Sequence, residues 1–542
     1  MTQDKDILEL LERVAHLMEL AGENPFKIRA FKNAAAILEG EKQIATLALS
    51  GQLTKIKGIG KGIEEVVLDY VRLGTSSVQK ELEAELPQGL LELVKVPGLG
   101  PKKARVLIQE LGIQSLSELE YACQENRLLK LKGFGDKAQN KILEGARFLQ
   151  ASQGQSRLVE AEEAAAAAMR DLGKLLPKDS KIFVTGEIRR KREVISQIEL
   201  LVAGKTEAEI KRAVSKFKKN SSLPVSIHTC NFSDLGTRWI ESTGTEEHLT
   251  ALKKLGPLPK GQDENAIYLG LGIPWVSPEL RETGEEISLA KAGDLSSIVE
   301  EASVKGVFHN HTTYSDGTGS IEEMVVAAKA LGYKYIGISD HSQSAFYAQG
   351  LKEDALQKQE REIKKAQDRH PEIRVFWGIE SDILKDGSLD YPERILKRFD
   401  FVVASVHSRF GLDRETMTRR IITAIQNPHT CILGHPTGRL LLGRPAYEVD
   451  MERVIQAATK SNVAIEINAH PARLDLDWRW GKTLRENKTL VMINPDAHST
   501  EGLGDTKYGV TVARKGLLPA TQVLNNLTAD EIGSWLKKRQ KS

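Results

Sequence analysis

The segment FHNHTTYSDG at residues 308–317 carries the clearest information about the fold of the C-terminal half of the chain. A short apolar run leads up to His309. His309 and His311 stand two residues apart, so both imidazoles face the same way if the run is a strand. Asp316 follows on the ensuing loop. Imidazoles and a carboxylate are ligands that suit Zn, Mn or Fe. The segment therefore predicts a metal site at the end of a buried strand.

The same pattern of an apolar run ended by a polar residue recurs along the rest of the chain, with helical stretches between the runs. The later runs end before Asp340-His341, Glu380, His407, His435, Asn468 and Asp496. His498 repeats the two-apart spacing in NPDAHS. Seven such units predict a distorted seven-stranded (β/α)7 barrel over residues 301–542, with its site at the carboxyl ends of the strands.

Nine residues are candidate metal ligands at this rim. A lone histidine at a strand end is more often a satisfied polar residue, but nine converging residues favour a metal centre. Two or more metals can activate a water and stabilise both oxygens of an in-line phosphoryl displacement. We take His309, His311, Glu380 and Asp496 as catalytic candidates. The full ligand set comprises His309, His311, Asp316, His341, Glu380, His407, His435, Asp496 and His498.

An internal repeat marks the N-terminal region: LTKIKGIGKGIEEVV (53–67), LVKVPGLGPKKARVL (93–107) and LLKLKGFGDKAQNKI (128–142). Each copy predicts a helix, a Gly-x-Gly turn and a second helix, whose opening N–H groups can bind a phosphate. A single Gly-x-Gly is more often a plain turn, but three copies with basic flanks favour sequence-independent contact with the DNA backbone. The candidate contacts are Gly58, Gly60, Lys61, Gly98, Gly100, Lys102, Lys103, Gly133, Gly135 and Lys137.

Length and composition limit the remaining possibilities. A chain of 542 residues is expected to form several domains, and a net charge of +2 leaves DNA binding to local basic patches. Cys123, Cys230 and Cys431 lie far apart and suit a reducing cytoplasm, and no segment predicts a membrane span. We expect a cytoplasmic monomer. Strand patterns at 181–186, 197–203 and 225–230 predict an α+β domain over residues 151–240, followed by a smaller loop-rich unit at 241–300.

The rim motifs FHNHTTYSDG, SDHS, GIE, SVHS, GHPTGR, EINAHP and NPDAHS resemble those of the PHP (polymerase and histidinol phosphatase) domain. The resemblance implies three divalent metals, either Mn²⁺ or Zn²⁺ with Fe²⁺ as a third option. One metal would lie among His309, His311, Glu380 and Asp496, and Glu380 would bridge to a second held by His407 and His435. Asp316, His341 and His498 would hold the third. The chain departs from the family at Phe308, where the family often has aspartate.

The Gly-x-Gly repeats resemble helix-hairpin-helix motifs, which divides the N-terminal region into residues 1–85 and 86–150. ENPFKIRAFKNAA, GEIRRKREVISQIELLV and DENAIYLGLGIPWVSPELRE are similar to bacterial family X DNA polymerases (PolX). The resemblance implies a palm-like nucleotidyltransferase domain at 151–240 and a thumb-like domain at 241–300. In that family a Gly-Ser grips the triphosphate and three aspartates hold catalytic magnesium. Those four positions are here Glu187, Gln197, Glu199 and Ser226.

Magnesium needs hard anionic oxygens, so Gln197 and Ser226 predict a degenerate polymerase site with little nucleotide addition. The leading hypothesis is a DNA repair nuclease, mainly a 3′–5′ exonuclease, with AP-endonuclease or 3′-phosphatase activity also considered. It would act on gapped, nicked or 3′-end DNA. The alternatives are an active gap-filling polymerase with an attached exonuclease, a non-catalytic DNA-binding scaffold and a small-molecule phosphatase.

Two arginines beyond the strand ends, Arg439 and Arg473, are candidates for bidentate contacts with DNA phosphates. An ion pair with a nearby carboxylate such as Asp475 is about equally favoured. The sequence alone leaves the two possibilities open.

Overall fold

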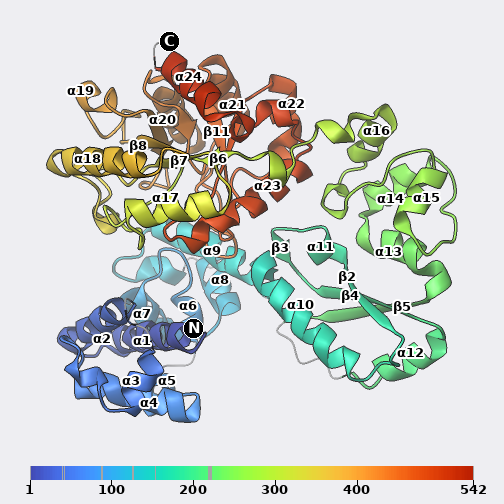
Figure 1. Ribbon diagram of the computed structural model, residues 1–542. Coiled ribbons are helices and arrows are strands. Elements are labelled where there is room, and N and C mark those ends of the chain that lie inside the picture. The colour runs from blue at the N-terminus through green and yellow to red at the C-terminus, as the bar shows by residue number, and fades with distance from the viewer. Residues whose placement is uncertain are drawn as a thin grey trace. The chain divides into compact units, whose positions relative to one another are not determined.

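The computed structural model describes residues 2–39, 41, 43–86, 89–124, 127–152, 154–217 and 223–540 (Figure 1). The chain divides into two compact units, Met1–Gln153 and Gly154–Ser542. Across the described residues, no helix is both long and apolar enough to cross a membrane. The finer division into five domains remains a prediction.

The first unit is helical throughout its described residues, and it has two hydrophobic cores. One core joins residues of the first five helices, and the other lies mainly among the last four. The helices are α1 (Thr2–Ala21), α2 (Pro25–Leu38), α3 (Ile44–Leu49), α4 (Lys61–Leu73), α5 (Ser77–Glu85), α6 (Leu90–Leu93), α7 (Pro101–Leu111), α8 (Leu116–Gln124) and α9 (Asp136–Ser152).

The three Gly-x-Gly turns share one backbone geometry. The first glycine of each turn has a positive φ, 102° at Gly58, 87° at Gly98 and 92° at Gly133, a conformation that favours glycine. The second glycine stands directly before α4, α7 or α9. The predicted repeat of helix, turn and helix is therefore present, whereas the phosphate contacts remain a prediction.

The second unit begins with the short strand β1 (Ser156–Arg157). The helix α10 (Leu158–Gly173) follows and packs through its apolar residues on one face of a three-stranded sheet (Figure 1). The sheet order is β2 (Lys181–Thr185), β4 (Ile198–Gly204) and β5 (Val225–Asn231). β4 runs antiparallel to β2 and parallel to β5. All three strands lie where the sequence predicts them. Shorter helices follow, α13 (Leu235–Thr243), α14 (Glu246–Lys253), α15 (Glu264–Gly270) and α16 (Glu285–Ala292).

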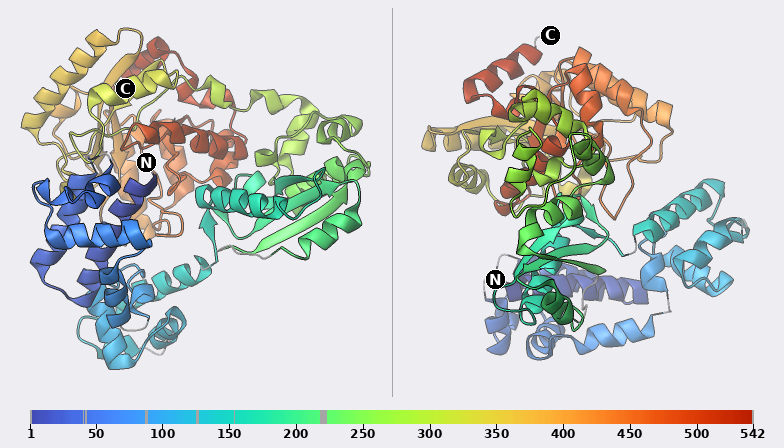
Figure 2. Two further views of the ribbon diagram at one scale, coloured as in Figure 1. Left: turned by 60° about the horizontal axis from the view of Figure 1, so that its bottom comes forward. Right: turned by 90° about the vertical axis from the view of Figure 1, so that its right-hand side faces the viewer.

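The C-terminal part of this unit is the predicted seven-stranded barrel. Neighbouring strands are parallel and follow chain order, and a parallel bridge between Asn310 and Ala497 joins the two edges, so the barrel is nearly closed. Figure 2 shows the yellow-to-red helices around these strands from two further directions. The strands are β6 (Gly306–Val307), β7 (Tyr335–Ile338), β8 (Arg374–Asp382), β9 (Phe401–Ser405), β10 (Ile432–Leu433), β11 (Ala464–Asn468) and β12 (Val491–Asn494).

An aromatic core fills the barrel interior. Phe308 packs edge-on against Phe401 at 4.9 Å between ring centroids and also contacts Tyr335 and Phe376. The core includes Ile532 and Leu536 of the C-terminal helix α24 (Ala529–Arg539). Phe308, the position that departs from the family, is thus a core residue. The polar residues of the predicted site lie at the carboxyl ends of the strands.

Candidate metal centre

All nine predicted ligands come together at the carboxyl ends of the barrel strands. Within the described residues, their ligand atoms form four overlapping groups in which the atoms lie within 4.8 Å of one another. The groups are His311, Asp316, His341 and His498; His309, Glu380 and His435; His309, His311 and Asp496; and His341, Glu380 and His407.

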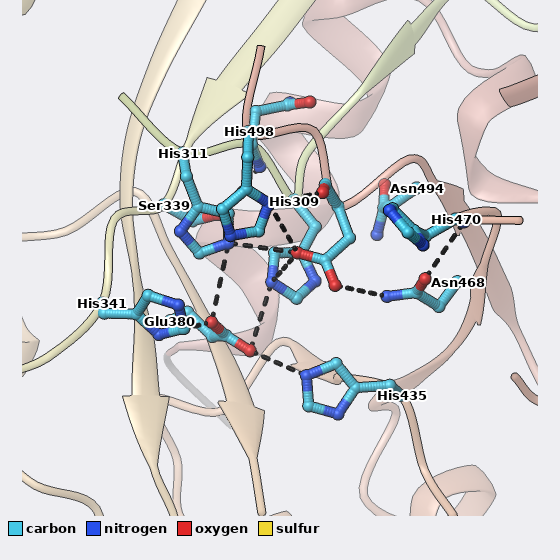
Figure 3. A network of polar contacts seen from close by, with 12 residues as sticks. His309, His311, Ser339, His341, Glu380, His435, Asn468, His470, Asn494 and His498 are labelled. Carbon is cyan, nitrogen blue, oxygen red and sulfur yellow. Dashed lines mark hydrogen bonds and ion pairs between the residues drawn. The ribbon is translucent and has the colours of Figure 1, made fainter. Parts of the chain in front are cut away.

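Glu380 lies at the centre of this arrangement, and Figure 3 shows histidines turned toward it from several sides. Its Oε1 is 3.0 Å from Nε2 of His435 and 3.2 Å from Nε2 of both His309 and His407. Its Oε2 is 2.9 Å from Nδ1 of His341. Burial alone would raise the pKa of Glu380, but the surrounding imidazoles hold it well below its ordinary value. One ionised carboxylate among imidazoles is suited to bridge two cations.

His309, His311 and Asp496 form a group of three buried residues. The Nε2 atoms of His309 and His311 lie 3.5 and 3.2 Å from Asp496 Oδ1. Both nitrogens are buried and make no hydrogen bond within the described chain. Leaving buried polar atoms unsatisfied is costly, and a cation between them and the carboxylate would satisfy all three. The residues therefore fit a divalent metal.

The protonation of His311 agrees with this fit. Its burial, together with the neighbouring imidazoles of His498 and His341, lowers the pKa of His311 to about 3. The ring is thus neutral at physiological pH, which is the form that binds metals.

The outer group opens toward solvent. Asp316 lies 3.5 Å from His341 and 3.4 Å from His498, measured between carboxylate oxygen and Nε2. Although burial opposes it, hydrogen bonds from His341 and His498 lower the pKa of Asp316. The side chains of Asp316 and His498 are 31% and 39% exposed, whereas those of His309 and His311 are fully buried. A substrate would therefore reach the centre from the Asp316 side.

Two buried carboxylates that the sequence analysis missed hold the ligands in place. Glu466 is 2.8 Å from Nδ1 of His309 and accepts the backbone N–H of His435 at 2.7 Å. Asp382 is 2.7 Å from Nδ1 of His407. A partner on Nδ1 fixes the tautomer so that the Nε2 lone pair points at the centre. Glu466 stands two residues before Asn468 on β11, so period-two alternation toward the barrel interior could have found it.

Asp340 ends its predicted strand but belongs to no ligand group. Its buried carboxylate accepts hydrogen bonds from the N–H and hydroxyl of Thr312, the hydroxyl of Ser315 and the side-chain amide of Gln359. Burial raises its pKa. Asp340 thus fixes the loop that carries Asp316.

The two candidate phosphate-binding arginines have different surroundings. Arg473 Nε lies 3.4 Å from Asp496 Oδ2, at the edge of the centre. Arg439 instead forms an ion pair with Asp477 and donates to the backbone carbonyls of Arg473 and Leu474. The ion-pair alternative is therefore present for both arginines, with Asp496 for Arg473 and with Asp477 rather than Asp475 for Arg439. DNA contact by either arginine stays a prediction.

The four positions predicted to be a degenerate polymerase site lie together at the three-stranded sheet. Glu199 on β4 is directly paired with Ser226 on β5, Gln197 precedes β4, and Glu187 lies on α11 (Gly186–Arg189). No group of three or more metal-ligating side chains occurs among the described residues of this sheet.

The two carboxylates at the sheet have different surroundings, because Glu187 is hydrogen-bonded within the chain and Glu199 packs closely against a glycine. Glu187 Oε2 accepts the backbone N–H of Ser196 at 2.8 Å and its hydroxyl at 2.9 Å. The Glu199 carboxylate lies over Gly186, so close that a Cβ added there would stand 1.6 Å from Glu199 Oε2. Gln197 and Ser226 provide no anionic oxygen at this sheet, and the Glu187 carboxylate is occupied by Ser196.

Nearby arginines are also committed to ion pairs. Arg189 binds Glu264 through two hydrogen bonds of 2.8 and 2.7 Å and lies over the Trp239 ring at 3.5 Å. Arg281 makes a second pair of hydrogen bonds with the same carboxylate. These contacts join residues 151–240 to residues 241–300 through buried charges.

Comparisons with known proteins agree with this architecture. A PHP domain model matches residues 308–470, a helix-hairpin-helix domain matches 3–76, and a SAM-like helix-hairpin-helix tandem matches 90–147. The Bacillus subtilis (strain 168) "DNA polymerase/3'-5' exonuclease PolX" is 34% identical to the chain, covering 98% of the chain and 99% of that protein. The chain belongs to the PolX family. The predicted PHP, helix-hairpin-helix and PolX resemblances are confirmed.

Other relatives of this PolX family member match a shorter part of the chain. A "Probable phosphatase" of Acetivibrio thermocellus is 30% identical over 43% of the chain and 95% of its own length. One from Caldanaerobacter subterraneus is 30% identical over 31% of the chain and 68% of its own length. The PHP domain is a metal-dependent hydrolase fold, so the chain is a hydrolase-type enzyme. The helix-hairpin-helix matches and the PolX membership support DNA binding.

Proposed function

We propose that this PolX family member is a metal-dependent 3′–5′ DNA exonuclease and that the barrel rim is its catalytic centre. The observation that carries the proposal is the convergence of nine ligand side chains into four overlapping groups within the described residues. The name of the Bacillus subtilis relative, which includes 3′–5′ exonuclease, supports the direction of digestion.

The nine residues would hold three divalent cations, shared out as the family pattern implies. Imidazole-rich sites favour Mn²⁺, Zn²⁺ or Fe²⁺ over an all-magnesium site. Bound metals would supply an activated water and neutralise the charge of an in-line phosphoryl displacement. The chain's own part is to orient the imidazoles through Glu466 and Asp382 and to bring Arg473 to the substrate phosphate.

The helix-hairpin-helix unit would hold the DNA backbone. Gly60 and Gly100 are the N-caps of α4 and α7, and a Cβ at either would meet no described atom of the unit within 4 Å. The N–H groups that open these helices are therefore accessible to a phosphate. Such contacts read no sequence, which suits an enzyme of gapped, nicked or 3′-end DNA. AP-endonuclease and 3′-phosphatase activities are compatible with the same chemistry.

The three-stranded sheet is proposed to add few or no nucleotides. Gln197 and Ser226 provide no anionic oxygen, the Glu187 carboxylate is hydrogen-bonded to Ser196, and Glu199 packs closely against Gly186. The gap-filling alternative predicts primer extension in Mn²⁺, and the scaffold alternative predicts protein without transition metal. Both can be tested on the purified full chain.

The exonuclease proposal is tested with 5′-labelled DNA that has a recessed 3′ end. The protein is stripped with a chelator, and Mn²⁺, Zn²⁺ and Mg²⁺ are returned separately. We expect shortening of the labelled strand with Mn²⁺ or Zn²⁺, and none with Glu380→Ala. The matched control is Glu372→Ala, which removes an exposed glutamate of the same domain. Digestion by the Glu380→Ala protein at the wild-type rate would contradict the proposal.

A small-molecule phosphatase is the second candidate, because relatives that match part of the chain are named probable phosphatases. Rates on DNA and on histidinol phosphate separate the two functions. A higher kcat/KM on histidinol phosphate would favour the phosphatase.

A further inference from the structure

Residues 468–480 connect the metal centre to the three-stranded sheet region, and they carry Arg473 to the edge of the rim. The segment leaves the end of β11, passes Arg473 beside Asp496 and ends in the short helix η8 (Trp478–Trp480). Its far end contacts Glu193, which lies just before β3 (Val194–Ile195) in the region predicted to be palm-like.

The contact with Glu193 is buried and charged. Arg479 Nη1 donates to Glu193 Oε1 at 2.6 Å, and Trp478 Nε1 donates to Oε2 at 3.2 Å. Burial would raise the pKa of Glu193, but Arg479 and Arg192 lower it to about 2. Glu193 is thus an anion with defined partners and is only 7% exposed.

From Arg479 a continuous series of polar contacts leads to the metal centre. The same Arg479 nitrogen lies 2.7 Å from Asp477, and Asp477 forms an ion pair with Arg439. Arg439 Nε donates to the backbone carbonyl of Arg473 at 3.0 Å, and Arg439 also donates to the carbonyl of Leu474. The Arg473 guanidinium then lies 3.4 Å from Asp496.

We propose that Glu193 is a positioning residue for the nuclease. Through Arg479, Asp477 and Arg439 it sets the backbone at residues 473–474, and this places the Arg473 guanidinium at the metal centre. The inference rests on the proposed exonuclease function. On this inference the palm-like region has a role that does not involve a nucleotide. It holds Arg473 in the position from which its guanidinium would bind a phosphate.

The alternative is that the contact only stabilises the fold. Trp478 is surrounded by cations, with Arg192, Arg479 and Lys515 at 5.7, 4.6 and 5.2 Å from its ring, so some loss of stability is expected on mutation. A purely structural role would lower activity by the same factor whatever residue stands at position 473. A positioning role would not, because its effect passes through Arg473.

The test is a double-mutant cycle in the full chain. Arg479→Ala and Glu193→Gln are each made alone and with Arg473→Ala, and 3′-end digestion is measured in Mn²⁺ under single-turnover conditions. Arg453→Ala is the matched control, since Arg453 is also a 46%-exposed arginine of the barrel in an ion pair. Melting temperature and bound metal are recorded for every variant.

We expect Arg479→Ala and Glu193→Gln to lower the rate about 10-fold when Arg473 is present, since small misplacements at a reacting centre are costly. In the Arg473→Ala background each should change the rate by less than about twofold, because no guanidinium remains to be positioned. The Arg453→Ala protein should match the wild type.

Equal losses in both backgrounds, or an unchanged rate when Arg473 is present, would overturn the inference. If Glu193→Gln does not fold, Arg479→Ala at its half-exposed position decides alone. A wild-type chain with no metal-dependent digestion would instead overturn the proposed function, and the inference with it.

Discussion

The barrel rim and the three-stranded sheet each bring polar side chains together, but the surroundings of these side chains differ. At the rim, buried ring nitrogens of His309 and His311 face Asp496 without a hydrogen bond. At the sheet, Glu187 is satisfied by Ser196 and Glu199 folds over Gly186. Buried groups without a hydrogen-bond partner are costly and favour binding of a cation, whereas a carboxylate that is hydrogen-bonded within the chain, such as Glu187, has little capacity left to bind one.

The largest effect that bears on this comparison is expected next to the three-stranded sheet, in the ion pairs of Glu264 on α15, and it is on stability. Glu264→Ala would leave Arg189 and Arg281 as buried cations without their shared carboxylate. Removing one partner of a buried pair costs about 3–5 kcal/mol. Denaturant unfolding should show this loss, while the Mn²⁺ affinity of the folded variant stays at the wild-type value. A Glu264→Ala protein as stable as the wild type would contradict a structural role for the ion pairs of Glu264 with Arg189 and Arg281.

The next effect is expected at the rim, and it is on metal binding. Glu466→Ala removes the partner of His309 Nδ1 and of the His435 backbone. Loss of such a support lowers metal affinity or activity by about 10- to 100-fold. A Mn²⁺ titration of the exonuclease rate measures it, with Glu372→Ala as control. An unchanged midpoint would show that Glu466 is only a core residue.

The hairpins should give a smaller effect, on DNA affinity. Lys102→Ala and Lys103→Ala remove cations beside the Gly98–Gly100 turn. Each lysine that touches a phosphate should reduce the slope of log affinity against log salt by about 1, equally for all DNA sequences. Fluorescence anisotropy in a salt series measures this, with the exposed Lys364→Ala as control. A slope equal to that of the wild type would show that Lys102 and Lys103 do not contact DNA phosphates.

The smallest effect concerns pH and residues 241–300. His248 is fully buried between Glu286 and Tyr268, and burial lowers its pKa although the Glu286 hydrogen bond opposes this. The unfolded chain therefore binds the proton first, so the free energy of unfolding falls as pH drops below about 6.5. When the pH drops from about 7.5 to about 5.5, the melting temperature of His248→Gln should fall less than that of the wild type. Equal losses would contradict this account.

The barrel and its ligands could be predicted because each strand is an apolar run that ends at a polar residue, as at Glu380 and Asp496. The positions of β2, β4 and β5 followed from similar local patterns. Residue type and spacing act over a few neighbours, so they are visible in a sequence.

The supports of the centre could not be predicted in the same way. Glu466 and His309 are 157 positions apart, and their contact depends on barrel closure. Arg439 could have paired with either Asp475 or Asp477, since the two stand two residues apart and only the path of the loop selects between them. The engagement of Glu187 by Ser196 likewise depends on tertiary packing.

One measurement tests both sides of the comparison. A 5′-labelled gapped DNA is incubated with the full chain, Mn²⁺ and all four deoxynucleotides, beside the Glu380→Ala variant. The account predicts that the wild type shortens the primer and that the variant neither shortens nor lengthens it. A primer lengthened by the variant would contradict the claim that the three-stranded sheet adds few or no nucleotides. A primer shortened by the variant as fast as by the wild type would contradict the claim that the barrel rim is the catalytic centre of this chain.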